Sequence, residues 1–301
     1  AFDLEAFLAG RQSPVFFGSA INNFGVREIL NTLVELAPSP GSRKALQREV
    51  SPAENKFSAV VFKIQANMDP AHRDRVAFLR ICSGHFQRGM KLKICRNGKE
   101  VRTNNALSFL SQRRDILDEA FPGDIIGLPN HGLLRLGDTL TEGEQLQFTG
   151  LPFFAPEIFR MVESADPLRS KQLRTGLMQL GEEGAIQVFR PMTGGTMLLG
   201  AFGQLQFEVV SHRLQTEYGA EVRLLPARYN LARWVSSDDP VALKKFIQEN
   251  IHRMAEDVVG ASVFLASHKS ELDVAQQRWE SIQFHALREH AGLIYQSDLA
   301  G

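Results

Sequence analysis

The pattern of apolar residues changes near the middle of the chain, and this change limits the possible folds more than any other feature. From Asn55 to about Phe148, short segments rich in Val, Ile and Phe alternate with Gly, Asn and Pro turns. Many short strands of this kind predict a closed antiparallel β-barrel, because closure removes exposed sheet edges. After Gly150 the pattern alternates between strand and helix. We therefore predict a barrel followed by an α+β domain.

The α+β part is predicted to have the order βαββαβ, which is the ferredoxin-like arrangement. We place its strands and helices at 157–163, 167–180 (helix), 186–190, 196–200, 204–218 (helix) and 221–225. In the second helix, Leu205 and Val209 are predicted to face inward, together with Val210 and Leu214 on the flank of the same face.

The last 75 or so residues are predicted to form a helical and strand extension. Asp239 followed by Pro240 indicates a helix start, because a carboxylate caps the first turn and proline fits there. A strand at 262–266 and a helix at about 270–288 are expected to follow. The sequence shows no internal repeat.

The beginning of the chain predicts a separate amphipathic helix. After a turn at 22–25, apolar residues recur at three- and four-residue spacing from Val26 to Val34. Residues 37–52, rich in Pro, Gly and charge, are interpreted as a linker. Together these patterns divide the chain into residues 1–40, 41–150 and 151–301.

Charge is balanced in total but uneven along the chain. The 34 Lys and Arg equal the 34 Asp and Glu, and a zero sum by itself argues against a nucleic-acid partner. Residues 73–114, however, hold eleven basic and two acidic residues, a net charge of +9. Such a strip favours contact with RNA phosphates, and a solvated face is the alternative. The predicted contacts are Arg88, Lys91, Lys93, Arg96, Lys99, Arg102, Arg113 and Arg114.

Other compositional features narrow the environment. Cys82 and Cys95 are too far apart for a CxxC pair and are expected to be small core residues, which favours a reducing compartment. The eight histidines include no HExxH motif, so we predict no metal site. The sequence has no apolar run near the ~20 residues of a membrane span and no secretory n-region, so a cytoplasmic location without membrane contact is predicted. Ala rather than Met at position 1 suggests a piece of a longer protein.

Several fragments imitate nucleotide-binding motifs without completing them. Gly84 and Gly89 have P-loop spacing, but Met90-Lys91 follows where Lys and then Ser or Thr are required. The glycines at 195 and 200 fail in the same way, and Ser58 replaces the aspartate of an NKxD motif. We predict that Gly84 to Gly89 is a barrel turn, that this chain has no catalytic residue, and that alone it neither binds nor hydrolyses GTP.

Three separate groups of residues resemble the translational GTPases. The first group resembles the end of their G domain, and the second resembles their second, barrel domain. The third resembles the third domain of elongation factor G, although 189–192 and the stretch from Val235 onward are more similar to the bacterial class II peptide chain release factors. The groups are Phe16–Ala20 with Leu36–Pro40; Gly84–Phe86, Pro122–Leu128 and Leu136–Leu140; and Leu173–Glu183 with Gly200–Val209.

The resemblance implies a role for each part. Residues 1–40 would be the C-terminal end of the G domain, with Ser19 and Ala20 in the loop beside the guanine base. Residues 41–150 would be the translation-factor barrel, domain II, and 151–301 domain III with its extension. The P-loop, DxxG and NKxD motifs would lie before Ala1. The chain itself would carry no cofactor, whereas the intact protein would use GTP or GDP with Mg²⁺.

By the same resemblance, the intact protein would be a monomeric, ribosome-dependent GTPase. It would contact ribosomal RNA and ribosomal proteins and promote dissociation of class I release factors after peptide release. Two alternatives remain open, a stand-alone RNA-binding or ribosome-binding module and a fragment of an elongation factor G-like translocase. The reading frame upstream of Ala1 discriminates the first alternative, because a GTPase requires G-x-x-x-x-G-K-[ST] there.

Overall fold

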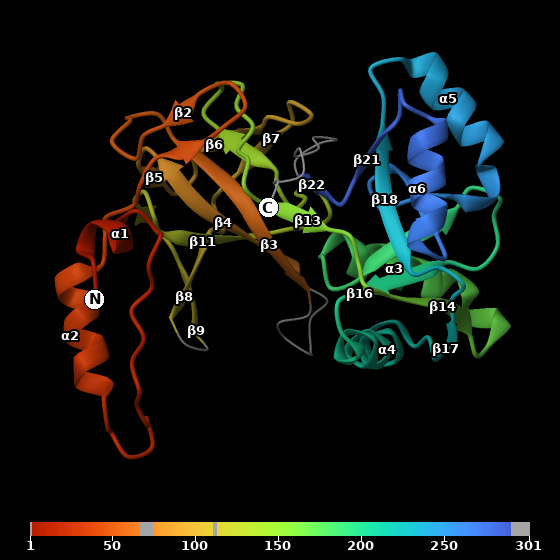
Figure 1. Ribbon diagram of the computed structural model, residues 1–301. Helices are drawn as coiled ribbons and strands as arrows, with labels where there is room; N and C mark the ends of the chain where they lie inside the picture. Colours follow the sequence, from red (N-terminus) through yellow and green to blue (C-terminus); the bar gives the residue numbers. More distant parts are fainter. Residues whose placement is uncertain (1, 67–74, 111–112, 290–301) are drawn as a thin grey trace. The chain divides into compact units, whose positions relative to one another are not determined.

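The computed structural model describes residues 2–66, 75–110 and 113–289 of the chain (Figure 1). The chain divides into two compact units, residues 1–42 and residues 43–301. Each unit is described below by itself.

The first unit contains α1 (Leu4–Leu8) and α2 (Val26–Leu36), and α2 confirms the predicted amphipathic helix. Gly25 precedes α2 in the left-handed region, with φ of +70°, and an added Cβ would lie 2.6 Å from the carbonyl oxygen of Phe17. Only glycine fits this close approach. The helix ends at Leu36, shortly before Pro38, and has no buried residue.

The second unit contains a curled antiparallel sheet of eight strands, which confirms the antiparallel barrel-type fold. The predicted closure is wrong for the described residues, because the first and last strands of this sheet do not pair with each other. The strand order is β7-β6-β12-β3-β4-β11-β8-β9, so β7 and β9 are its edges. The strands are β3 (Ser58–Ala66), β4 (Arg75–Ser83), β6 (Lys91–Ile94), β7 (Glu100–Arg102), β8 (Leu107–Leu110), β9 (Arg113–Ile116), β11 (Ile125–Pro129) and β12 (Thr139–Thr141).

Two short strand pairs accompany this sheet. In the first, β1 (Arg43–Lys44) pairs with β2 (Glu49–Val50), and in the second, β5 (Phe86–Gln87) pairs with β10 (Glu119–Ala120). Val50 is fully buried beside Leu146 and Phe148. The region interpreted as a linker therefore contributes a core residue to the second unit.

Asn97 and Gly98 lie in the turn of the β6–β7 hairpin, and this turn is not of the type I′ that an Asn-Gly pair favours. A type I′ turn requires positive φ at both central residues, and here Gly98 has φ of +70° while Asn97 does not. The amide of Gly98 instead donates to the carbonyl oxygen of Ile94 at 2.8 Å, closing a four-residue loop. Longer hairpin loops commonly place one left-handed residue after a type I turn.

Both cysteines are buried, as predicted. Burial raises the pKa of the Cys82 thiol to about 11. We expect native protein to resist Ellman's reagent at pH 8 at Cys82 and to react there in urea, as peptide mass spectrometry will show. The unfolded thiol ionises near pH 9.0 and the folded thiol only near 11, so stability falls between these pH values. Fast labelling of native Cys82 would contradict this.

The second half of the unit confirms the predicted βαββαβ order. Its elements are β14 (Ile158–Ser164), α3 (Ser170–Glu182), β15 (Gln187–Pro191), β16 (Leu198–Ala201), α4 (Gln204–Tyr218) and β17 (Val222–Pro226), with a 3₁₀ turn, η1, at Pro167–Arg169. The strand order is β17-β14-β16-β15, and every pair is antiparallel. When the four strands of the motif are numbered 1 to 4 as they follow along the chain, this order is 4-1-3-2.

The C-terminal extension repeats this topology, so the statement that the chain has no internal repeat is wrong at the level of the fold. It contains β18 (Leu231–Ser236), α5 (Pro240–Glu249), η2 (Ile251–Arg253), β19 (Met254–Glu256), β20 (Ser262–Ala266), α6 (Lys269–Arg278) and β21 (Gln283–His285). The strand order β21-β18-β20-β19 is again 4-1-3-2. The predicted cap of α5 is confirmed, because Asp239 accepts a hydrogen bond from the amide of Val241 at 2.8 Å.

The predicted helix at 270–288 is wrong in its second half. α6 ends at Arg278, and β21 and β22 (Leu287–Glu289) follow. Ile282 and Phe284 then pack against α5 and α6 from strand and turn positions rather than from a helix. Ile282 follows Trp279 at the three-residue spacing of a helix, whereas Phe284 follows Ile282 at the two-residue spacing of a strand. The helix prediction used the first spacing alone and therefore extended too far.

The two βαββαβ motifs form one continuous sheet. Their second strands, β15 and β19, pair antiparallel with Pro191 opposite Ala255. One face of the sheet carries the helices of both motifs, since Val188 packs with α3 and α4 while Met254 packs with α5 and α6. The other face is lined by Phe189, Trp234, Val263 and their neighbours. Phe153 of β13 (Pro152–Phe154) packs against this second face, and β13 pairs with β22.

Helix α4 spans the predicted residues, and Val210 and Leu214 face inward as predicted, but the centre of the buried face is shifted away from Leu205 and Val209. Phe207, Val210 and Leu214 are buried, whereas Leu205 and Val209 are exposed at 69% and 48%. Both sets have helical spacing. The sheet is contacted by the set that contains the larger Phe207 ring.

Substitutions on α4 test this orientation. Leu205→Gln and Val209→Gln are expected to change the free energy of unfolding by less than about 0.5 kcal/mol, because both side chains are exposed. Leu214→Ala on the same helix is expected to lower it by about 2–5 kcal/mol, because it leaves a cavity. Urea unfolding followed by far-ultraviolet circular dichroism measures both. A large loss from Leu205→Gln would support the original prediction instead.

Candidate RNA-contacting hairpin and junction pocket

The β6–β7 hairpin, residues 91–102, carries four cations of the predicted basic strip that form no ion pair among the described side chains, and we call it the basic hairpin. Lys91 and Lys93 alternate with the buried Leu92 and Ile94, so they point away from the core. In the hairpin register, Lys91 lies directly opposite Arg102, and Lys93 lies opposite Glu100. Lys99 is exposed next to the turn.

Like charges directly opposite each other on a sheet are destabilising. Within the described part of the chain, Lys91, Lys93, Lys99 and Arg102 form no ion pair with a carboxylate. Their charge is therefore left for solvent ions or an anionic partner. This arrangement suits a phosphate backbone, which gains affinity by releasing its own counterions.

Other members of the strip are occupied within the protein. Arg88 pairs with Asp118 at 3.2 Å and donates to the carbonyl oxygen of Asn104. Arg96 makes a two-pronged hydrogen bond with Asp138, at 2.6 and 2.9 Å. Arg113 and Arg114 lie in β9, but their side chains are outside the described residues. RNA contact by the eight residues stays a prediction.

Ser19 and Ala20 lie in a tight turn of the first unit. Ser19 and Phe24 exchange two backbone hydrogen bonds, at 2.9 and 3.0 Å, which close the turn. Ala20 is exposed at its tip. The predicted place of these residues beside a guanine base remains untested.

The Gly84–Gly89 segment follows β4 directly and contains β5, which pairs with β10. An added Cβ at Gly84 would lie 2.5 Å from the backbone nitrogen of Phe57, so this segment packs closely on the start of β3. This packing fits the predicted role as a turn of the barrel, and the expectation that the chain alone does not bind GTP stays a prediction.

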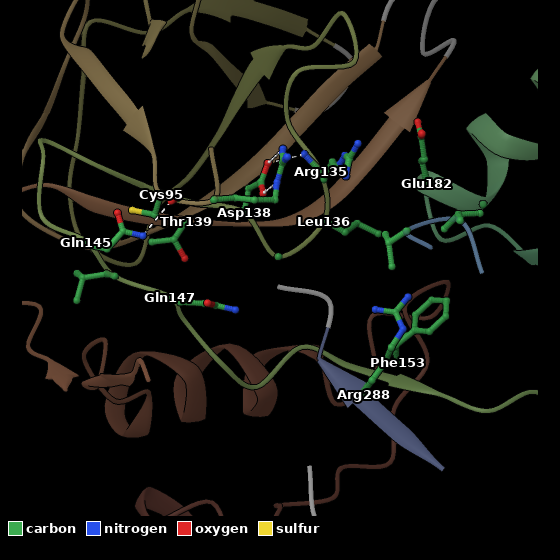
Figure 2. A pocket seen from close by; sticks show the side chains of 16 residues that line it. Cys95, Arg135, Leu136, Asp138, Thr139, Gln145, Gln147, Phe153, Glu182 and Arg288 are labelled. Carbon is green, nitrogen blue, oxygen red and sulfur yellow. Dashed lines mark hydrogen bonds and ion pairs between the residues drawn. The ribbon is translucent and has the colours of Figure 1, made fainter. Parts of the chain in front are cut away.

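A pocket of about 380 Å³ lies where the curled sheet meets the α/β sheet within the second unit (Figure 2). Asp138 immediately precedes β12. Its carboxylate accepts hydrogen bonds from the Arg96 guanidinium and from the backbone amide of Arg135, the latter at 2.9 Å. Phe153 and Arg288 line the pocket from the α/β side, as Figure 2 shows. Because the carboxylate of Asp138 is paired with an arginine, it is not free to act as a general base.

A series of ion pairs also connects the curled sheet with the α/β sheet. Arg75 at the start of β4 lies 3.8 Å from Glu182 and 3.7 Å from Glu183, at the end of α3. Glu183 in turn pairs with Arg213 of α4 at 3.0 Å. Burial raises the pKa of Glu183, although Arg213 and Arg75 act in the opposite direction. The pairs made by Arg75 connect residues more than a hundred positions apart.

The described residues hold neither a metal-binding cluster nor a membrane-spanning helix. They contain no cluster of three or more His, Cys, Asp or Glu side chains arranged to hold a metal ion. They also contain no helix that is long and apolar enough to cross a bilayer.

The curled sheet followed by a ferredoxin-like motif defines a protein of the translation-factor class. Residues 56–143 match the family model "Elongation factor G domain 2". The crystal structure of a Thermus thermophilus protein designated ttk003000868 aligns with a TM-score of 0.59 at 25% identity, covering 78% of this chain and 34% of that one.

Within this class, the chain belongs to the class II peptide chain release factors. Residues 148–276 match "Class II release factor RF3, C-terminal domain". Peptide chain release factor 3 of Nitrosomonas europaea is 68% identical over 296 residues, 98% of this chain and 55% of that protein. The Bordetella pertussis protein of the same name is 66% identical over the same shares. The chain thus spans about half the length of these curated relatives.

Proposed function

We propose that this chain supplies ribosome-contacting domains to a translation termination factor. The intact protein, in this proposal, is a GTPase that uses GTP or GDP with Mg²⁺ in the cytoplasm. On the ribosome it promotes dissociation of class I release factors after the peptide has been released. The support is the relatives' shared name, peptide chain release factor 3, over 98% of this chain.

The basic hairpin is the observation that carries the ribosome contact. Lys91 and Arg102 are neighbours on its outward face without a carboxylate partner among the described residues. Ribosomal RNA presents a dense array of phosphates, and each neutralised phosphate adds to the salt dependence of binding. The hairpin is therefore assigned to RNA rather than to a neutral protein surface.

The test is a double charge reversal, Lys91→Glu with Arg102→Glu. Co-sedimentation with ribosomes over a range of salt concentrations measures the association constant. We expect at least a tenfold loss at low salt and a slope of log K against log salt that is shallower by about 1.5, or ~0.7–0.9 per phosphate. The difference between variant and parent should shrink as salt rises.

Lys244→Glu with Lys269→Glu is the matched control. Both lysines are exposed in the second βαββαβ motif, far along the chain from the hairpin, and the double reversal changes the net charge equally. Equal losses from the two double variants would indicate general electrostatics and remove the hairpin's role. An unchanged salt slope in the hairpin variant would mean that its cations are only solvated.

The two alternative functions make different demands. A stand-alone RNA-binding module binds ribosomes through the same hairpin but needs no nucleotide domain, so the reading frame upstream of Ala1 decides that case. An elongation factor G-like translocase is disfavoured by residues 148–276, which match the release factor domain.

A further inference from the structure

The short strand β22 pairs with β13, the strand that follows the curled sheet in the chain. Phe153 lies opposite Arg288, and Pro152 lies opposite Glu289. Both charged side chains of β22 are buried, each with 1% exposure. Charged residues are almost never buried to this degree without specific partners.

Glu289 binds the backbone immediately before β13. Its carboxylate oxygens accept from the amide of Gly150 at 3.1 Å and from the amide of Leu151 at 3.0 Å. These amides belong to the segment that joins the curled sheet to the first βαββαβ motif. Hydrogen bonds from backbone N–H groups to a carboxylate are among the stronger ones in proteins, so Glu289 holds these two amides in place.

Arg288 contacts the α/β sheet, on the face that does not carry the helices. Its guanidinium lies 4.4 Å from the centre of the Phe153 ring and 5.4 Å from that of Trp234. Its Nε lies 3.0 Å from an Oδ of Asp257. Asp257 also accepts from the indole of Trp234 at 3.0 Å, so these groups form one network.

We propose that Arg288 and Glu289 act together as a clamp on residues 150–154. Glu289 holds the backbone of the joining segment, and Arg288 anchors β22 to Asp257 and Trp234 of the second motif. The last strand of the described chain thereby fixes the place where the first motif leaves the curled sheet. Opening the clamp releases the joining segment while both sheets keep their own cores.

Glu289→Gln tests the clamp. Oε2 of Glu289 accepts from both amides, whereas Oε1 accepts only from the amide of Gly150. A carboxamide keeps one acceptor oxygen but turns an NH₂ donor toward at least one of these N–H groups and removes the negative charge, so both hydrogen bonds are weakened. We expect hydrogen exchange of residues 150–154 to accelerate at least tenfold, measured by mass spectrometry, while exchange in β3, β4 and α3 stays unchanged. Glu280→Gln, at an exposed position, is the control and should leave all rates unchanged.

Arg288→Met is the second variant, because methionine keeps apolar contact but removes the cation. In a Trp279→Phe background only Trp234 remains as a tryptophan fluorophore, and its emission should shift with Arg288→Met but not with the exposed Arg174→Met. The same exchange pattern as in Glu289→Gln is expected. Unchanged rates at 150–154, or an equal rise throughout the protein, would overturn the proposal, the second because it indicates global destabilisation.

Discussion

Gly84→Ala is expected to destabilise the curled sheet by about 3 kcal/mol or more. Gly84 has φ of +73°, a conformation that costs a residue with a side chain about 1–2 kcal/mol. The added Cβ would also lie 2.5 Å from the nitrogen of Phe57 and 2.6 Å from the carbonyl carbon of Lys56. These are backbone atoms, so β3 and the β4–β5 turn must separate. Urea unfolding followed by circular dichroism measures the loss.

Gly89→Ala is the matched control, since it is the other glycine of the P-loop-like spacing. Its φ is +84°, but the nearest atom to an added Cβ is a side-chain oxygen of Asn104 at 3.2 Å. Because this side chain can move, only the backbone cost of about 1–2 kcal/mol is expected. Equal losses at both glycines would contradict the packing argument. The expected difference assigns this glycine spacing to the structure of the sheet and not to phosphate binding.

Asp257→Ala is expected to lower the free energy of unfolding by about 3–5 kcal/mol, because it leaves a buried arginine without its counter-charge. Asp257 is 2% exposed and lies 3.0 Å from Nε of Arg288. Its second oxygen accepts from the amides of Val259 and Ala261, at 3.0 and 2.9 Å. The substitution leaves all of these groups without their carboxylate partner at once. Tryptophan fluorescence in a urea titration measures the effect.

Glu256→Gln, at the preceding position, is the control for Asp257→Ala. Glu256 pairs with Arg190 at 2.9 Å, but both side chains are about a third or more exposed. Such pairs contribute about 0–1 kcal/mol. If the two substitutions lower the free energy of unfolding equally, the network around Asp257 contributes no more to stability than an ordinary surface ion pair.

The type and order of the elements of the first βαββαβ motif could be predicted from local pattern, but the full buried face of α4 could not. Leu205 with Val209 and Phe207 with Val210 and Leu214 both recur at helical spacing. The choice depends on how the helix meets the sheet, which is a tertiary contact. The helix predicted at 270–288 extended too far for a different reason, because the prediction used the helical spacing of Ile282 alone, whereas Ile282 and Phe284 pack from a turn and a strand.

The positions of the cations in the basic strip could be predicted, but their ion-pair partners could not, because these also depend on tertiary contacts. A count along the sequence finds every cation but not its partner, and these partners are distant in sequence. Arg96 pairs with Asp138, and Arg75 lies near Glu182 and Glu183. The outward residues of the hairpin could be predicted, because Lys91 and Lys93 alternate with apolar neighbours. The Arg288–Glu289 pair offers no sequence signal, since a single Arg-Glu dipeptide is common on exposed helices.

The pairing of β15 with β19 has a consequence for dissecting the protein. In each motif the second strand would be an open edge if the motif stood alone, with unpaired backbone groups ready to recruit another chain. Joined in the order 4-1-3-2-2-3-1-4, each motif covers that edge of the other. Fragments cut between β17 and β18 would each expose an edge that the intact sheet keeps paired. The two motifs are thus each other's protection against aggregation.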